Sequence, residues 1–229
     1  MLVSIIIPSY NEKDTLSKIV DLVNNQKDIE KEIIVIDDYS TDGTRELIKK
    51  EIFNKVSKVI YHDKNLGKGA ALRSGLNASN GDIIIIQDAD LEYSPADYSI
   101  LLKPILDGRA DVVYGSRFQG GTHRVLFYWH SVGNKFLTTL SNMLTNLNLT
   151  DMETGYKVFT KKVKMTLSLE CDRFGFEPEF TAKVAKNKFR IFEVPITYNG
   201  RNYSEGKKIT WKDGVAAIYY IIKYTVFKK

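Results

Sequence analysis

Residues 82–91 read Asp-Ile-Ile-Ile-Ile-Gln-Asp-Ala-Asp-Leu, a run of four isoleucines followed closely by two carboxylates. A short, continuous β-branched run favours a strand that is covered on both faces, as in a parallel sheet flanked by helices. Asp88 and Asp90 would then lie at the carboxyl end of this strand, where open α/β sheets bind their ligands. The segment therefore predicts both the fold class and the place of the site.

Apolar strand-like runs alternate with amphipathic stretches on both sides of this segment, which indicates the α/β class. Strands are expected over residues 3–7, 32–36, 56–61, 82–87, 111–115 and 190–196. Helices are expected over residues 16–23, 44–52, 67–78, 94–106, 132–148, 177–186 and 211–227. Without an internal repeat or a linker, we expect one α/β domain with a mostly parallel central sheet, helices on both faces and a C-terminal amphipathic helix.

The composition excludes several classes of protein. In 229 residues, 43% hydrophobic and 27% charged side chains are typical of a soluble globular chain and not of a disordered or fibrous one. Cys171 is the single cysteine, so an internal disulfide and a cysteine zinc cage are excluded. The three histidines are scattered along the sequence and do not have the spacing of metal ligands. The first residues have no basic leader and Pro8 ends their apolar run early, so we expect a cytoplasmic location.

The charge favours an anionic partner. Lys and Arg number 33 against 28 Asp and Glu, a formal net charge of +5. Nucleic acid, a nucleotide diphosphate and an acidic membrane surface would each fit this charge, which does not choose among them.

Acidic residues follow two of the expected strands. Asp88 and Asp90, spaced i and i+2, could share one hard cation whose other positions are filled by water and phosphate oxygens, and Glu92 could add a third ligand. Alternatively, these acids cap the next helix. Asp37 and Asp38 follow the second strand, where a nucleotide's base and ribose would need carboxylate acceptors, although residues 40–43 could simply cap a helix.

Two further loops lie at the same expected edge. Pro8, Tyr10 and Glu12 end the first strand and offer an aromatic face and a carboxylate. Residues 65–70 read Asn-Leu-Gly-Lys-Gly-Ala, in which two glycines would let backbone amides approach a phosphate at a helix N-terminus. The chain has neither a Walker motif here nor G-x-G-x-x-G after the first strand, which argues against a phosphate-cleaving ATPase and a dinucleotide-dependent oxidoreductase.

Together these motifs resemble the family 2 glycosyltransferases of the GT-A type, and within them the polyprenyl-phosphate sugar synthases, such as the dolichyl-phosphate mannose and glucose synthases. The resemblance covers nearly the whole chain. It is carried by Pro-x-Tyr-Asn-Glu at 8–12, Asp-Asp-x-Ser-x-Asp-Gly-Thr at 37–44, Asn-x-Gly-Lys-Gly at 65–69, Asp-Ala-Asp-Leu at 88–91, Gly-Ser-Arg-Phe at 115–118, Asp-x-x-Thr-Gly-Tyr-Lys at 151–157 and Glu-Val-Pro-Ile at 193–196.

The resemblance implies a Rossmann-like GT-A catalytic domain over residues 1–195, with residues 196–229 as a basic loop and amphipathic helix of the same domain. It implies that Asp88, Asp90 and Glu92 bind Mg²⁺ or Mn²⁺, although the mannose synthases commonly have Gln in place of Glu92. The catalytic residues would be Asp90, Arg117 and Asp151. The donor and acceptor would be held by Pro8, Tyr10, Glu12, Asp37, Asp38, Lys68, Ala89, Arg201 and Lys207, with Arg124 and Ser131 as weaker matches.

The implied reaction is inverting transfer of a hexose from a nucleotide sugar, UDP-glucose or GDP-mannose, to a polyprenyl phosphate. A divalent cation would stabilise the charge of the departing diphosphate, and an ionised acceptor phosphate needs cations but no strong base. If the acceptor were instead a sugar hydroxyl of lipopolysaccharide, capsule or another glycan, Asp151 or Glu153 could act as general base. A non-catalytic nucleic-acid-binding module is a remote alternative that lacks any recognition motif.

Membrane contact is also expected. The apolar run 215–222 is too short to span a bilayer, but with Tyr219, Tyr224, Phe227 and neighbouring lysines it could lie in the interface at the inner face of the cell membrane. Alternatively, this helix packs on the core. Residues 127–129, Phe-Tyr-Trp, could receive an isoprenoid chain or pack under the sheet. The chain has neither the Gln-x-x-Arg-Trp motif nor the several membrane spans of processive family members, which argues against polysaccharide synthesis.

Overall fold

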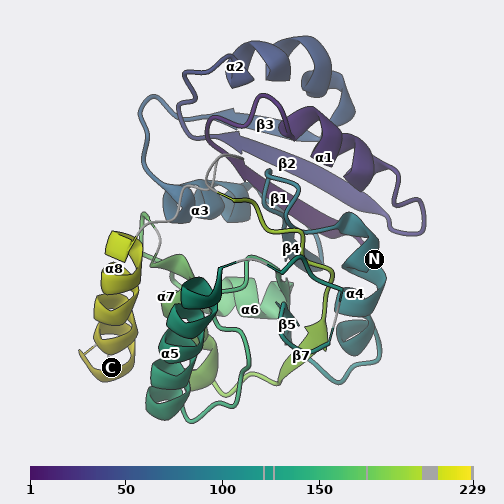
Figure 1. Cartoon of the computed structure of the whole chain (residues 1–229). Helices are drawn as coiled ribbons and strands as arrows, with labels where there is room; N and C mark the ends of the chain where they lie inside the picture. The colour runs from purple at the N-terminus through teal and green to yellow at the C-terminus, as the bar shows by residue number, and fades with distance from the viewer. Residues whose placement is uncertain (121, 126, 174, 203–210, 228–229) are drawn as a thin grey trace.

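The computed structural model describes residues 1–120, 122–125, 127–173, 175–202 and 211–227. Its centre is a seven-stranded sheet in the order β3-β2-β1-β4-β6-β5-β7 (Figure 1). The strands are β1 (Val3–Ser9), β2 (Lys31–Asp37), β3 (Lys58–Tyr61), β4 (Ile83–Ile86), β5 (Val112–Ser116), β6 (Lys157–Thr160) and β7 (Ile191–Pro195). All neighbours are parallel except β6, which is antiparallel to both β4 and β5. The predicted α/β class with a mostly parallel sheet is confirmed.

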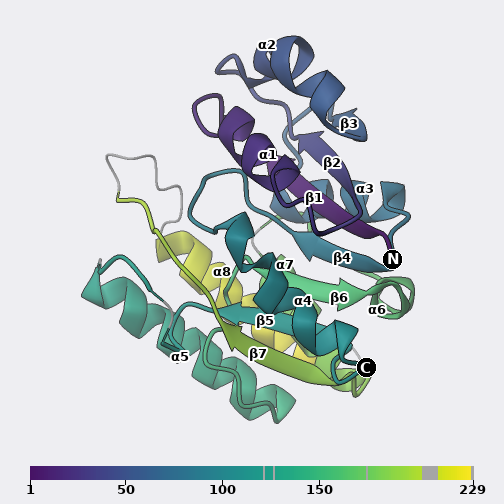
Figure 2. The ribbon, with the colours of Figure 1, turned by 90° about the vertical axis from the view of Figure 1, so that its right-hand side faces the viewer.

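Helices cover both faces of the sheet, as expected. They are α1 (Leu16–Asn24), α2 (Thr44–Leu47), α3 (Lys68–Ala78), α4 (Tyr98–Leu106), α5 (Tyr128–Thr145), α6 (Lys161–Thr166), α7 (Phe176–Lys186) and α8 (Trp211–Ile222). Helices α1 and α4 pack with one buried cluster and α3, α6, α7 and α8 with the other, so the four isoleucines of β4 are buried from two sides. Figure 2 shows α4 in front of β5 and β7 and α8 behind them.

The structure differs from the expected elements in a few places. Strand β6 and helix α6 were not expected, because a four-residue strand that begins with a lysine has no recognisable apolar period. Helix α2 continues as a π-helical turn over Ile48–Ile52, and α5 begins four residues earlier than expected. The expected cap before α4 is present: the Ser94 hydroxyl accepts from the Ala96 amide, with Pro95 next to it.

The last helix packs on the core along one face, and its expected membrane contact stays a prediction. Ala217 and Ile221 of α8 are buried against the core, as is Tyr224 in the π-helical turn Lys223–Phe227 that follows. Val215 and Tyr219 of the same helix are exposed. Helix α8 lies beside α5 (Figure 1), and both present apolar side chains outward.

Helix α3 lies unusually close to the sheet at Gly75. A Cβ atom at this position would be 2.4 Å from Ile6 Cγ2 and 2.8 Å from Ile36 Cδ1, in the middle of β1 and β2. The glycine therefore sets the distance between α3 and these two strands, and β1 leads into the site described below. Gly133 of α5, by contrast, has nothing within 4 Å of its ideal Cβ position.

The two helical glycines give a matched test of this packing. Gly75→Ala should lower the free energy of unfolding, because overpacking costs about 1–3 kcal/mol, more than the helix propensity that alanine gains. Gly133→Ala should raise it by about 0.5–1 kcal/mol, since only the propensity changes. Urea unfolding followed by circular dichroism measures both. Equal effects of the two substitutions would contradict the close approach of α3.

Candidate functional site

The loops after β1 and β4 meet at one edge of the sheet, around the side chain of Arg201. Its Nη2 lies 2.7 Å from Asp90 Oδ2, its Nη1 3.5 Å from Glu12 Oε2 and its Nε 3.5 Å from Glu92 Oε1. The Arg201 amide also donates to Glu92 Oε1 at 2.8 Å, and the Tyr198 hydroxyl donates to Glu92 Oε2 at 3.0 Å. We call Glu12, Asp90 and Glu92, together with the adjacent Asp88, the acidic edge.

The acidic edge requires positive charge. Burial and the neighbouring carboxylates Asp88 and Glu92 raise the pKa of Asp90 to about 7, and Arg201 only partly opposes this rise. The carboxylates in turn raise the pKa of Arg201 above its ordinary value, although burial opposes the rise. Hard carboxylate oxygens of this kind are the ligands that Mg²⁺ and Mn²⁺ prefer. The side chains of the acidic edge therefore fit a divalent cation in type and in charge.

The acidic edge is not arranged around a single metal position. Within the described ranges, no three acidic, histidine or cysteine side chains form a ready-made metal site. Asp88 has a cation of its own, since Lys68 Nζ lies 3.0 Å from Asp88 Oδ1 and 3.1 Å from Glu177 Oε1. Binding of one ion by both aspartates thus requires that Arg201 and Lys68 give up or share their partners.

Asp37 and Asp38, expected to hold the nucleoside, are buried and bonded within the protein. Asp37 Oδ2 accepts from Arg45 Nε at 2.6 Å. Asp38 accepts from the Leu66 and Gly67 amides at 2.9 and 2.7 Å and pairs with His62 Nδ1 at 2.7 Å. These carboxylates stabilise the turn after β2 and the start of α3, and nucleoside binding by them stays a prediction.

The expected phosphate cradle at residues 65–70 has a packing role in this structure. A Cβ atom on Gly69 would lie 2.1 Å from the carbonyl oxygen of Cys171, and the Ala70 amide donates to the Asp172 carbonyl at 3.0 Å. Gly67 has φ +99°, a conformation that favours glycine. The two glycines thus let the loop at 171–173 press against the start of α3, and phosphate binding there stays a prediction.

The other residues predicted to hold the sugar donor or the acceptor have the following places in the structure. The Tyr10 ring is exposed directly after β1, and Pro8 lies within β1. The Ala89 methyl group is buried in the core. Lys207 lies outside the described residues. Arg124 Nη1 donates to the Gly200 carbonyl at 3.3 Å, and its amide donates to the Tyr198 carbonyl, so it is placed beside the segment that carries Arg201.

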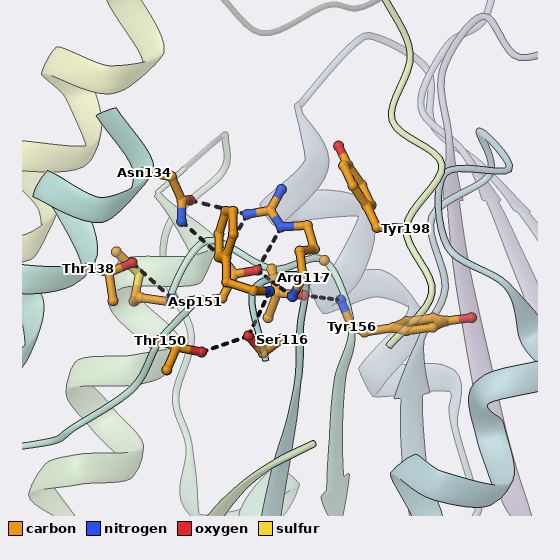
Figure 3. Close-up of polar contacts among 12 residues, drawn as sticks. Ser116, Arg117, Asn134, Thr138, Thr150, Asp151, Tyr156 and Tyr198 are labelled. Carbon is orange, nitrogen blue, oxygen red and sulfur yellow. Dashed lines mark hydrogen bonds and ion pairs between the residues drawn. The ribbon is translucent and has the colours of Figure 1, made fainter. Parts of the chain in front are cut away.

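Arg117 and Asp151 form a bidentate ion pair (Figure 3). Arg117 Nε lies 2.6 Å from Asp151 Oδ2 and Nη2 lies 2.7 Å from Oδ1. Asn134 of α5 accepts from Arg117 Nη2 and donates to Asp151 Oδ1, and the Tyr198 ring centroid lies 5.2 Å from the guanidinium carbon. The structure therefore brings the predicted residues Arg117 and Asp151 together, and Asp151 fixes the orientation of Arg117.

Sequence reasoning missed the buried charges below this pair. Glu177 at the start of α7 and Lys157 at the start of β6 are both buried. Burial lowers the pKa of Lys157 to about 8, and burial together with the charge of Glu177 raises the pKa of Glu153 to about 8. Lys157 stands within the apolar run 156–159, and this unusual placement is the signal that could have revealed it.

The pairing of Arg201 with the acidic edge predicts competition with metal. Arg201→Gln should increase the affinity of Mn²⁺ for the nucleotide-free protein about tenfold, because the ion no longer displaces a guanidinium from Asp90. Electron paramagnetic resonance of free Mn²⁺ during titration measures the affinity. Arg190→Gln is the control, since Arg190 forms a bidentate pair with Asp111 at the exposed surface, away from the acidic edge. Unchanged or weaker Mn²⁺ binding by Arg201→Gln would contradict the competition.

Comparison with solved structures confirms the GT-A type of fold. Glucosyl-3-phosphoglycerate synthase from Mycobacterium tuberculosis, in complex with Mn²⁺, UDP and glucosyl-3-phosphoglycerate, superposes with a TM-score of 0.76 at 19% identity, over 99% of this chain and 81% of that one. The same enzyme with Mg²⁺ and UDP gives a TM-score of 0.74 at 20% identity, over 99% of this chain and 80% of that one. At this level of sequence identity, the similarity shows the fold alone.

Comparison of sequences shows the family. Polyprenol monophosphomannose synthase of Mycolicibacterium smegmatis is 31% identical, over 89% of this chain and 79% of its own. UDP-N-acetylglucosamine–dolichyl-phosphate N-acetylglucosaminyltransferase of Methanococcus voltae is 29% identical, over 96% of this chain and 95% of that protein. Glycosyltransferase AglJ of Haloferax volcanii is 30% identical over 87% of this chain, which spans 63% of AglJ. The model of "Glycosyl transferase family 2" matches residues 4–166, so the chain belongs to the family 2 glycosyltransferases.

Proposed function

We propose that this glycosyltransferase transfers a hexose from a nucleotide sugar to a polyprenyl phosphate, with inversion and with a divalent cation. One observation carries the proposal: the acidic edge and the Arg117–Asp151 pair lie on adjoining loops that Tyr198 connects. The Tyr198 hydroxyl binds Glu92, and its ring lies against the Arg117 guanidinium. A site for a metal-bound diphosphate thus lies next to a site for a second anion.

On the donor side, Asp88, Asp90 and Glu92 would hold Mg²⁺ or Mn²⁺, which when bound stabilises the negative charge that develops on the leaving diphosphate. The exposed Tyr10 ring would stack on the nucleoside base. The name of the Methanococcus voltae relative, which gives UDP-N-acetylglucosamine, supports a nucleotide-sugar donor. Arg201, once it releases Asp90, supplies a cation beside the diphosphate or the acceptor.

On the acceptor side, the structure favours a phosphate over a sugar hydroxyl. Both carboxylate oxygens of Asp151 accept hydrogen bonds from Arg117, and Oδ1 accepts from Asn134 as well. A carboxylate that is occupied by a guanidinium is a poor general base. A phosphate acceptor is already ionised near neutral pH and needs only the cation that this pair orients. The names of the mannose and N-acetylglucosamine transferases among the relatives support the same acceptor.

The acceptor lipid requires contact with a membrane, which we place on helices α5 and α8. Tyr128 and Trp129 are 72% and 77% exposed, so these two side chains do not pack under the sheet. A cavity of about 420 Å³ beside them is lined by Tyr128, Val132, Lys135 and Phe136 among others, and it has room for isoprene units. None of the helices in the described ranges is long and apolar enough to cross a bilayer. We therefore propose peripheral attachment at the inner face of the cell membrane.

Vesicle binding tests this attachment. The double variant Tyr128→Ser/Trp129→Ser should bind phosphatidylglycerol vesicles about tenfold more weakly than the unmodified chain in sedimentation, because two aromatic rings no longer enter the interface. Phe53→Ser is the control, since Phe53 is exposed on the turn before β3. Equal vesicle binding by all three proteins would contradict the proposed surface.

Transfer itself is tested with labelled UDP-glucose and GDP-mannose, Mn²⁺ and undecaprenyl phosphate. Labelled lipid phosphate should form, and Asp90→Asn should reduce the rate at least about a hundredfold, because the metal loses a charged ligand. Asp107→Asn, at an exposed position after α4, should leave the rate unchanged. Full activity of Asp90→Asn would refute the metal role. Transfer to a sugar hydroxyl instead of the lipid would refute the acceptor and favour the glycan-synthesis alternative.

A further inference from the structure

Residues 151–156 form a loop that connects the two halves of the site. At one end, Asp151 is fixed by Arg117. At the other end, Gly155 lies directly against Asp88, since a Cβ atom there would be 2.3 Å from Asp88 Oδ2, and its amide donates to the Tyr93 hydroxyl at 2.9 Å. Glu153 lies between these two ends along the chain, near enough to Arg117, Asp151, Lys157 and Glu177 for their charges to act on it.

The Glu153 carboxyl group is unpaired among the described residues. Its Oε1 atom is buried from solvent and has no hydrogen-bond partner, although the residue as a whole is only partly buried. Neighbouring carboxylates do have partners: Glu193 accepts hydrogen bonds from the amides of Thr150 and Asp151, and Glu177 forms an ion pair with Lys68. A buried polar atom without a partner destabilises a fold and calls for an explanation.

The loop does not need Glu153 for its shape. Lys157 Nζ donates to the carbonyl oxygens of Met152 and Thr154, at 3.1 and 2.5 Å, and so holds the backbone on both sides of Glu153. Glu193 and Arg117 hold the beginning of the loop, as described above. A carboxyl group that has no hydrogen bond among the described residues, on the loop that joins the two halves of the site, is available for a ligand.

The surroundings of Glu153 indicate what kind of ligand it binds. Glu177 and Asp151 oppose its ionisation, Lys157 and Arg117 favour it, and burial is the largest influence, so that its pKa of about 8 keeps the carboxyl group mainly neutral at pH 7. A neutral carboxyl group offers one donor and one acceptor. This combination matches a hydroxyl group, which is also a donor and an acceptor, whereas a metal ion requires an ionised carboxylate.

We propose that Glu153 binds a hydroxyl group of the hexose carried by the nucleotide sugar and thereby contributes to selection of the sugar. The inference rests on the proposed function, since it takes the donor to be a nucleotide sugar held at the acidic edge. The hexose lies between the metal-bound diphosphate near Asp88 and the acceptor near Arg117, which is where residues 151–156 run. Glu153 is thus a binding residue for the sugar and not a base.

Calorimetric titration with Mn²⁺ present tests the assignment without turnover. Two pairs of probes are used, UDP with UDP-glucose and GDP with GDP-mannose, and the ratio of affinities within a pair gives the contribution of the hexose. Glu153→Met should reduce this contribution about tenfold and leave binding of the nucleoside diphosphate unchanged. Glu153→Gln, whose amide also offers a donor and an acceptor, should retain it within about threefold. Glu46→Met, on the exposed side of α2, is the control.

Monodeoxy analogues of the hexose identify the hydroxyl group. For the unmodified chain, one deoxy analogue should bind about tenfold more weakly than the parent nucleotide sugar, and this difference should disappear in Glu153→Met. The proposal is overturned if Glu153→Met binds the nucleotide sugar as tightly as the unmodified chain, or if it loses nucleoside diphosphate and nucleotide sugar affinity equally. Failure of the unmodified chain to bind either pair would instead refute the proposed donor class, and with it this inference.

Discussion

The crowding of carboxylates at the carboxyl edge of the sheet is the constraint on which the site depends. Glu12, Asp90 and Glu92 come from loops after β1 and β4, and like charges so close together and partly buried are unfavourable unless cations balance them. Arg201 forms ion pairs with all three of these carboxylates, and Lys68 forms an ion pair with the adjacent Asp88. These pairings, together with that of Lys68 with Glu177, bring the segment that carries Arg201 and the start of α7 to this edge.

Much of the fold and the position of the site could be predicted from the sequence. The alternation of β-branched runs and amphipathic stretches indicates α/β topology because strands buried on both faces and helices buried on one have different periods. The carboxyl ends of parallel strands meet at one edge, so Asp88, Asp90 and Glu12 could be placed near one another. Arg117 and Asp151 were predicted as site residues only through the resemblance of their motifs to the family, whereas their ion pair spans 34 positions and is a finding of the structure.

Other features depend on contacts that no local pattern contains. Asp37 and Asp38 have the same residue type as Asp90, yet they turn inward because Arg45, His62 and amides of the next loop supply partners there. Arg201 meets Asp90 across 111 positions of sequence, so only tertiary packing shows that this cation lies among the proposed metal ligands. The short antiparallel strand β6 and the unpaired Glu153 are likewise consequences of how loops pack, and not of hydrophobic period.

Anomalous diffraction from a crystal of the full chain grown with Mn²⁺ and UDP, or with Mn²⁺ and GDP, tests the central claim most directly, because it locates the ion itself. The account predicts one manganese peak within bonding distance of an Asp90 carboxylate oxygen and of the diphosphate, with the Arg201 guanidinium moved away from Asp90. A bound nucleotide whose diphosphate is neutralised by Arg201 and Lys68 alone, with no manganese at Asp88, Asp90 or Glu92, would contradict it.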